Sequence, residues 1–416
     1  MNTRKLLNQK KGLILGIESN NLDTFIITRH LLTNKFSNLL NNNISELVLN
    51  KKNFVTTATM VSPKEVKTVG IHFPQFHQIP ENDRFWGEGF TEWTFLKDAI
   101  RKLDIGTYNH DIRKPHADIG YYDLAEKDAR KKQADLAKQY NVDIFMYYHY
   151  WFGGNKVMYK VPEAAANMEE PNLPFFVCWA NEPWNKIWTG QEKHVLLAQD
   201  YGSLSDWQKH YNYLDTLFKS PLYYKLDGKP VIAIYRPADI PQLEQMLATW
   251  RKLATPTYGG LFIISSTIRN YTYPPQNVRS LFDALYLFEP HNSLNRPLHA
   301  DPKTKTVHSS AVAEQIINST RNKNQFMGVF THWDNSPRYQ KTPKLSTYHT
   351  KPDPLIFKKQ LLVQLVKALM TESPNDKEDL IFISSWNECV MEPSIQDGYG
   401  FLEAHKDAKQ FITKTF

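Results

Sequence analysis

Short runs of β-branched and aromatic residues recur along the chain from residue 66 onward. Within each run the apolar residues follow one another instead of alternating with polar ones, which is typical of parallel strands buried on both faces. These runs predict eight strands, at Val66–Phe73, Asp143–Tyr150, Pro174–Trp179, Pro230–Tyr235, Gly260–Ser266, Ala284–Glu289, Phe326–Thr331 and Leu380–Trp386.

Segments with helical spacing separate the runs. They predict helices at Leu124–Tyr140, Pro162–Glu170, Leu204–Ser220, Pro241–Leu253, Gln276–Asp283, Ala311–Arg321, Pro354–Thr371 and Leu402–Thr415. Eight strand–helix units in one chain predict the α/β fold class and a closed (β/α)8 TIM barrel. An open, doubly wound sheet is the alternative. The nucleotide-binding forms of that sheet lose support because neither GxGxxG nor GxxxxGK[ST] follows the first predicted strand.

Two regions do not follow this alternation. Residues 1–60 hold eight Lys and Arg against three acids, so they carry most of the net charge of +7. We expect residues 1–62 to be an N-terminal extension of unknown role and residues 63–416 to be the barrel domain. Residues 74–120 form a long loop after the first predicted strand. A barrel places such a loop at the face where active sites lie.

Composition narrows the classes of function. The net charge left outside residues 1–60 is near +2, which gives no sign of a nucleic-acid partner. No apolar stretch reaches the roughly 18 residues of a membrane span, so none is expected. Two cysteines, Cys178 and Cys389, are too few for a disulfide scaffold and typical of a reducing compartment. We therefore expect a cytoplasmic protein, and no motif predicts a cofactor.

Polar and aromatic side chains gather where the predicted strands end. In a parallel barrel these ends meet at one rim. Two Asn-Glu pairs, Asn181-Glu182 and Asn387-Glu388, follow the third and the eighth predicted strands. The other candidate substrate-binding residues are His77, Glu92, Tyr148, His149, Trp151, Trp179, Trp184, Trp333, Asp334 and Trp386.

This set of side chains indicates sugar chemistry. Aromatic rings stack on the C–H faces of pyranoses, while amides, imidazoles and carboxylates bind their hydroxyls. Making or breaking a glycosidic bond also needs two carboxyl groups. The two Asn-Glu pairs supply Glu182 and Glu388 as candidates. We expect the adjacent amides to hold substrate hydroxyls, and the partner to be an oligosaccharide or polysaccharide.

Other readings of the same residues stay open. Taken singly, each Asn-Glu pair and each aromatic run also fits a purely structural role. The rim histidines His77, His149, His291 and His332 would suit a metal-dependent hydrolase. No HExxH or CxxC spacing occurs, so no metal site is expected. A glycan-binding barrel that has lost catalysis is a further alternative.

Several of these motifs resemble a known family. Ile71–Asp83, followed by Phe85-Trp86-Gly87 and Gly89–Thr94, resembles the opening signature of the WbsX-type glycosyltransferase family, a relative of the endo-α-mannosidases of glycoside hydrolase family 99. The resemblance continues to the C-terminus through Tyr147–Phe152, Cys178–Trp184, Trp333–Asn335 and Ser385–Glu388. It implies a (β/α)8 barrel that makes or breaks a glycosidic bond, often in polysaccharide biosynthesis or modification.

The resemblance also implies roles for individual residues. In the endo-mannosidase relatives the motif after the last strand reads roughly Asn-Glu-Trp-x-Glu-Gly. Its first Glu, which acts on the sugar 2-hydroxyl, corresponds to Glu388. Met391 stands where the second Glu, the general acid/base, would be, and Glu392 follows it. We therefore expect Glu388 to be the first catalytic carboxylate and Glu182 its partner, with Glu392 as the second candidate for that role. Transfer and hydrolysis both stay open, and transfer would add a sugar donor as a partner.

Overall fold

The computed structural model describes most of the chain from residue 64 onward. The described residues are 64–104, 112–186, 191–267, 275–293, 306–307, 309–339, 349–350, 352–388, 394 and 398–415. The expected N-terminal extension, residues 1–62, lies outside them, as does Glu392.

Eight parallel strands within the described residues close into a barrel. They are β1 (Glu65–His72), β2 (Ile144–Phe152), β4 (Phe175–Trp179), β8 (Lys229–Ile234), β9 (Phe262–Thr267), β10 (Ala284–Leu287), β12 (Gln325–Phe330) and β14 (Glu378–Ser384). Each pairs with its neighbours in chain order, and β1 pairs with both β14 and β2, which closes the ring. The predicted (β/α)8 fold is confirmed, and all eight predicted strands are present.

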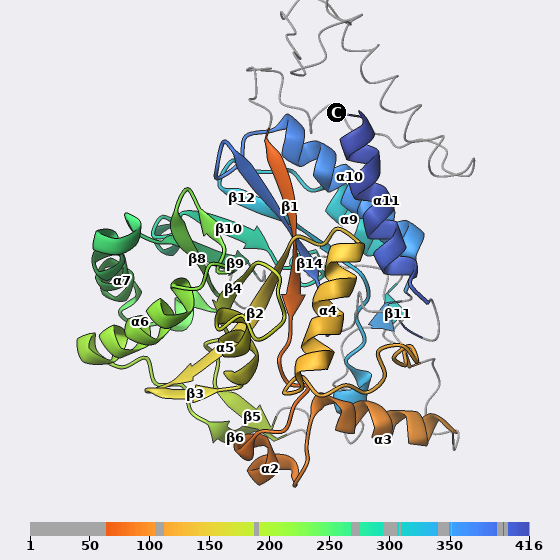
Figure 1. The fold of residues 1–416 in the computed structure, drawn as a ribbon, viewed down its shortest axis with the longest axis horizontal. Helices are drawn as coiled ribbons and strands as arrows, with labels where there is room; N and C mark the ends of the chain where they lie inside the picture. Colours follow the sequence, from red (N-terminus) through yellow and green to blue (C-terminus); the bar gives the residue numbers. More distant parts are fainter. Residues whose placement is uncertain are drawn as a thin grey trace, which may run out of the picture.

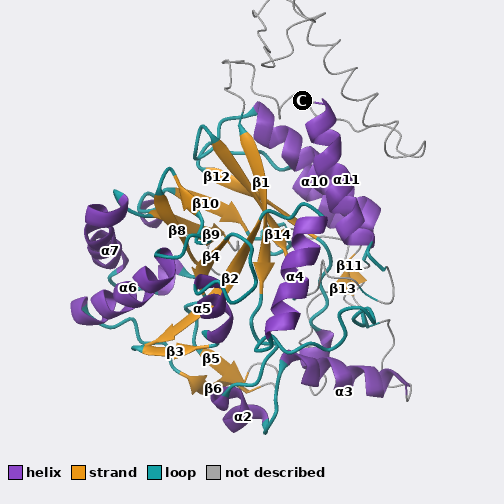
Figure 2. Ribbon diagram, in the orientation of Figure 1, coloured by secondary structure: helices purple, strands orange, loops and turns teal. Residues whose placement is uncertain are grey.

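Helices surround the barrel (Figure 2). They are α4 (Lys127–Gln139), α5 (Lys160–Ala166), α6 (Leu204–Phe218), α7 (Leu243–Tyr258), α8 (Gln276–Arg279), α9 (Ser309–Asn318), α10 (Pro354–Met370) and α11 (Gly400–Thr415). Each overlaps a segment that the sequence predicts to be helical. The last two pack closely against each other, as Figure 1 shows. This layer buries the outward faces of the strands, which explains why their sequences are apolar throughout.

Additional elements gather where the barrel strands end. The long segment after β1 forms α2 (Pro80–Trp86) and α3 (Glu92–Asp104). Antiparallel β5 (Trp184–Lys186) and β6 (Gln191–Leu197) form a hairpin after β4. In Figure 1 the arrowhead of β1 points toward α2, α3 and this hairpin. The insertions therefore build one face of the molecule, the face at which active sites of such barrels lie.

Smaller elements complete the described part of the chain. They are β3 (Asn155–Val157), β7 (Lys225–Leu226), β11 (Thr306–Val307), β13 (His349–Thr350) and the 3-10 turns η4 (Pro237–Asp239) and η5 (Ser336–Tyr339). The turn η5 follows β12, and residue pairs of α3 and η5 lie in contact. This contact carries residues of the segment after β12 to the long loop after β1.

Successive residues of each barrel strand face opposite ways. Inside the barrel, the rings of Tyr286 and Phe382 stack with centroids 4.3 Å apart. Outside it, His72 contacts Gln133 of α4, with Nε2 and Oε1 2.7 Å apart. Both layers are buried, so burial alone does not distinguish an inward-facing from an outward-facing side chain. None of the described helices is both long and apolar enough to cross a membrane.

Candidate active site

Each Asn-Glu pair is held to the barrel by its asparagine. The Asn387 side-chain amide, after β14, accepts from the backbone N–H of Phe73 at 2.7 Å and donates to its carbonyl at 2.8 Å. Asn181, after β4, does the same with Arg236, at 2.7 and 2.8 Å. Both asparagines are buried. The sequence predicts that these amides hold substrate hydroxyls, but in the structure they bond the backbone of the neighbouring strand end. They therefore fix the glutamates beside them.

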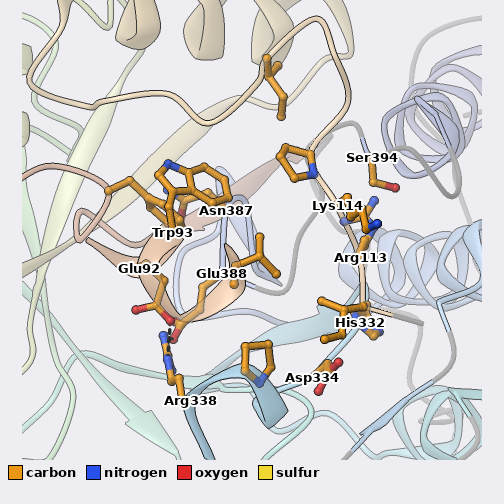
Figure 3. Close-up of a pocket in the computed structure, with 16 residues that line it drawn as sticks. Glu92, Trp93, Arg113, Lys114, His332, Asp334, Arg338, Asn387, Glu388 and Ser394 are labelled. Carbon is orange, nitrogen blue, oxygen red and sulfur yellow. Dashed lines mark hydrogen bonds and ion pairs between the residues drawn. The ribbon is translucent and has the colours of Figure 1, made fainter. Parts of the chain in front are cut away.

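Glu388 forms an ion pair with Arg338 of η5. The guanidinium Nη2 lies 2.6 Å from Glu388 Oε1, and its Nε lies 2.5 Å from Oε1 of Glu92, the first residue of α3. All three side chains are about 85% buried. Gln75 donates a further hydrogen bond to Glu92 at 3.0 Å. One guanidinium thus joins the end of β14 to the long loop after β1 (Figure 3).

Arg338 is held on several sides, and Glu92 shows the effect of burial in this triad. Burial raises the pKa of Glu92 above its ordinary value, Arg338 opposes the rise, and the charge of Glu388 adds to it. Arg338 also lies over the ring of Phe73, 5.4 Å from its centroid. A guanidinium held by two carboxylates and an aromatic face has little freedom to move. It therefore fixes the position of the Glu388 carboxylate.

Glu182 lies in a contrasting environment. Its Oε2 is buried and has no hydrogen-bond partner. Burial raises its pKa to about 7, Arg236 opposes the rise, and the charge of Glu388 is one of the contributions that raise it. Glu182 and Glu388 therefore lie near enough to interact electrostatically, although 206 positions separate them in the sequence.

Aromatic residues form the barrel mouth around these carboxylates. Tyr148 contacts Phe73 and Tyr235 edge-on, with centroids 6.3 and 6.0 Å apart. The charges of both glutamates contribute to raising the pKa values of Tyr150 and Tyr235, for which burial is the main cause. These rings therefore lie close to both carboxylates.

A pocket opens beside Glu388. Its volume is about 110 Å³. Its charged and polar lining residues are Glu92, Arg113, Lys114, His332, Asp334, Arg338, Asn387, Glu388 and Ser394. Figure 3 shows Glu92, Arg338 and Glu388 on one side of it and Arg113, Lys114 and His332 on the other. Asp334 accepts a hydrogen bond from the Ser336 backbone at 2.9 Å, which holds the turn into η5.

Three predicted sugar-binding residues pack between the barrel and its helices. His149 Nε2 lies 2.8 Å from Nε2 of His210 on α6. Trp151 stacks flat on His210 with centroids 4.5 Å apart, and Trp179 meets the same ring edge-on at 4.8 Å. Burial lowers the pKa of His149 to about 3. The structure does not bring these three side chains to the pocket, because their positions alternate with inward-facing ones.

Three other predicted tryptophans have different surroundings. Trp386 is fully buried, with its ring 4.9 Å from that of Phe145. Trp184, on the hairpin, is partly buried against Tyr150 and therefore lies near Glu182. Trp333 is half-buried, with its ring centroid 4.8 Å from that of His291. Of the three, Trp184 lies nearest to the aromatic mouth, and Trp386 belongs to the core.

His77 also lies apart from the pocket. Its ring is buried, and Nδ1 donates to the Pro74 carbonyl at 2.7 Å. Burial lowers its pKa, and the nearest charges that affect it belong to Asp123, Lys160 and Arg130. Across the described residues, no group of three or more His, Cys, Asp and Glu side chains is arranged to hold a metal ion.

The sequence analysis missed several residues of this site. Arg338 follows β12 by eight positions and belongs to no strand-end motif. Tyr150 and Tyr235 end predicted strands and were noted there, but were not selected. Trp93 stands beside Glu92 in the matched opening signature, which could have indicated it. Nothing in the sequence indicates that Arg338 joins Glu92 to Glu388, because these three residues are far apart in the chain.

Comparison with known proteins gives matches along most of the chain. Residues 68–405 match the family model described as Glycosyltransferase WbsX. Two curated relatives, each named "Uncharacterized protein WxcX" and from two strains of Xanthomonas campestris pv. campestris, are 29% identical over 354 residues. That alignment covers 82% of this chain and 49% of each relative, so the chain spans about half the length of the curated relatives it matches.

Solved structures resemble the fold. A "Glycoside hydrolase-like protein" matches with a TM-score of 0.52 and 15% identity, over 86% of this chain and 98% of that one. The GH99 endo-alpha-mannosidase from Bacteroides thetaiotaomicron matches with a TM-score of 0.48 and 14% identity, over 83% and 97%. At these identities the first likeness supports the barrel fold alone.

The family model covers more than three quarters of the sequence and spans every barrel strand from within β1 to β14. It includes both Asn-Glu pairs and Arg338. The chain therefore belongs to the glycosyltransferase WbsX family.

Proposed function

We propose that this protein is a carbohydrate-active enzyme that makes or breaks a glycosidic bond at the rim of its barrel. Glu388 is the carboxylate that works in its ionised form. Glu182 is the carboxyl group that carries the proton. One observation carries the proposal: two glutamates that each follow an asparagine bound to the neighbouring strand end have different surroundings. Arg338 forms an ion pair with Glu388, whereas the buried Oε2 of Glu182 has no hydrogen-bond partner.

The different surroundings support these separate roles. The Arg338 guanidinium forms an ion pair with Glu388 at 2.6 Å. Glu182 has a buried oxygen without a hydrogen-bond partner, and burial raises its pKa to about 7, so a large fraction holds its proton at neutral pH. Carboxyl pairs with separated proton affinities can divide the acid and the base or nucleophile work of glycosidic chemistry.

The reaction then follows from the positions of these groups. A sugar lies over the aromatic mouth with its anomeric carbon toward Glu388. Glu388 stabilises the positive charge that develops there, either directly or through the neighbouring hydroxyl. Glu182 gives its proton to the departing oxygen and takes one back from the incoming hydroxyl. The incoming group is water in hydrolysis and a sugar hydroxyl in transfer.

Substitution of the two carboxylates tests the proposal. Glu388→Gln and Glu182→Gln are each expected to lower turnover by about 10²–10⁴-fold, the usual contribution of a positioned acid or base. The matched control is Glu244→Gln, at an exposed position on α7, which is expected to leave turnover unchanged. Chromatographic product analysis, with and without acceptor sugars, distinguishes transfer from hydrolysis.

Two results would count against this function. Unchanged turnover in Glu388→Gln would remove the residue from the reaction. Oligosaccharide binding without cleavage or transfer by the unmodified protein, whatever donor is supplied, would favour a glycan-binding barrel instead. Membership of the glycosyltransferase WbsX family also supports a role in polysaccharide biosynthesis or modification. The expected partners are a glycan and, for transfer, a sugar donor.

A further inference from the structure

The pocket beside Glu388 has two kinds of wall. Charged side chains, among them Glu388 and Arg338, occupy part of it. The rest comes from apolar side chains of the long loop after β1 and of the turn before Arg338. The apolar residues that matter here are Phe76, Trp93, Leu96, Ile112, Ile119 and Pro337.

This apolar wall is a built part of the fold. Phe76 and Trp93 pack against each other with centroids 4.5 Å apart, and both are buried. Trp93 Nε1 donates to the Tyr122 carbonyl at 2.7 Å, so its only polar atom points to the backbone and its ring remains as an apolar surface. Leu96 follows on the same helix, one turn along, and packs on the core. The wall is therefore held in place before any ligand arrives.

Such a wall selects among sugars. A ring hydroxyl pressed against it would leave water without gaining a hydrogen bond, which is unfavourable. A methyl or acyl group would instead bury carbon against carbon. The cavity volume of about 110 Å³ exceeds the roughly 10–15 Å³ that one water needs by the same measure. A substituent of one to several heavy atoms can enter.

We propose that this pocket receives an apolar substituent of the substrate sugar: the methyl group of a 6-deoxy sugar or the acyl group of an acylated sugar. The inference rests on the proposed function for the position of the sugar ring at Glu388, and it names the substrate class of that site. Glu388 lines both the pocket and the barrel mouth, so one sugar residue meets the carboxylate and the apolar wall together.

Matched pairs of simple glycosides test this inference by binding. Methyl 6-deoxy-α-mannopyranoside is compared with methyl α-mannopyranoside, each in the D and L series. Methyl N-acetyl-β-glucosaminide is compared with methyl β-glucoside. Within a pair only the substituent differs, so the first arm reports a deoxy methyl and the second an acyl group.

Ligand-observed saturation-transfer NMR and calorimetry on the full chain give the readout. In at least one arm we expect the apolar member to bind about tenfold or more tightly than its partner, the usual range for such a pocket. The strongest saturation is expected at the methyl or acetyl protons. Equal affinity in every pair would overturn the inference, as would no measurable binding of any probe at tens of millimolar.

Variants of the apolar wall test whether the binding preference comes from this pocket or from elsewhere on the protein. Leu96→Asn keeps the side-chain size but adds polar groups, so the preference is expected to fall below about threefold. Leu355→Asn, at a position 69% exposed on α10, is the matched control and should keep the preference. If Leu96→Asn does not fold, Ile119→Thr makes a smaller polar change to the same wall. A preference that survives in the folded wall variant would contradict the proposal.

The same probes keep this inference distinct from the proposed function. In Glu388→Gln the apolar wall is intact, so the preference for the apolar member is expected to persist while turnover is lost. A preference without any dependence of turnover on Glu388 would leave the pocket assignment standing and remove the catalytic one. If Glu388→Gln loses turnover as expected but no pair shows a preference, the catalytic assignment stands and the pocket assignment is removed.

Discussion

The two Asn-Glu corners of the barrel share a backbone arrangement and differ in charge. At both corners a buried asparagine bonds the N–H and the carbonyl of the neighbouring strand end. The two glutamates that follow these asparagines have different partners. Arg338 contacts Glu388, while the buried Oε2 of Glu182 has no hydrogen-bond partner. The lesson is that one local motif can place two glutamates in different surroundings, because neighbouring elements and not the motif supply their charged partners.

The largest expected effect comes from removing the arginine at one corner. Arg338→Met leaves Glu92 and Glu388 buried without their shared counter-charge, and breaking such a pair costs about 3 kcal/mol or more. We expect the free energy of unfolding, measured by urea titration at pH 7, to fall by about 3 kcal/mol. The difference should shrink on acidification as Glu92, whose pKa burial raises, takes up its proton.

Arg338→Lys is the companion variant. Lysine keeps the charge but cannot offer two donors along one planar edge, so it is expected to recover part of the stability and less of the turnover. Equal stability of Arg338→Met and the unmodified protein at pH 7 would show that the two carboxylates do not depend on this guanidinium.

The shared backbone arrangement gives the next effect. Asn181→Ala and Asn387→Ala each leave one buried N–H and one carbonyl without partners, which costs about 2 kcal/mol. Because the two corners are equivalent in this respect, the two losses measured by thermal and chemical unfolding should be similar. Asn167→Ala, at an exposed position after α5, is the control and should change stability little. A large loss at only one corner would break the equivalence.

Glu182 should give the corners different pH dependences. Its pKa in the folded protein is about 7, against an ordinary value of 4.5. The folded state therefore holds a proton that the unfolded state releases, so this group's contribution to stability is present below about pH 4.5 and is lost as pH rises through about 7. Glu182→Gln should remove that component from unfolding free energies measured between pH 4 and 8. Turnover should likewise decline above about pH 7 as Glu182 loses its proton.

Glu244→Gln supplies the reference profile for this measurement, since its carboxyl group is exposed. Parallel stability profiles of Glu182→Gln and the unmodified protein would mean that Glu182 titrates in the ordinary range. That outcome would also remove its assignment as the proton carrier.

The smallest effect is expected from Glu92→Gln. The glutamine retains an oxygen for the guanidinium, and Arg338 keeps its contact with Glu388, so stability at pH 5 should change by about 1 kcal/mol or less. Because burial raises the pKa of Glu92, its ionisation makes the folded state less stable as pH rises, and the variant should gain relative stability toward pH 8. A tenfold loss of turnover would give Glu92 a direct part in the chemistry.

The sequence predicted the barrel well but did not predict which strand-end residues face the mouth. All eight strands and their helices are where the apolar runs and helical spacing place them. Both faces of a barrel strand are buried, however, so hydrophobicity does not alternate along it. The sequence therefore does not show which residues face the barrel interior and which face the helices. His149 and Trp151 therefore looked equivalent to Tyr148 and Tyr150, although α6 covers the first pair.

Long-range ion pairs were beyond sequence reasoning for a different reason. Arg338 lies in a short 3-10 turn, 246 positions from Glu92 and 50 from Glu388. Only the closure of the barrel and the contact of α3 with η5 bring these groups together. The Asn-Glu pairs were visible because strand ends in a parallel barrel share one rim. Arg338, which pairs with only one of the two glutamates, was not visible in the sequence because it reaches that rim from a turn.

Closure of the ring through β1 and β14 has a consequence for synthesis of the chain. The first strand pairs with the last, more than 300 residues later. During translation β1 can pair with β2 early but must wait for β14 to leave the ribosome, so one of its edges stays uncovered for most of that time. The nascent barrel is expected to be prone to aggregation at that edge, and slow or interrupted translation before residue 378 should increase its need for chaperones.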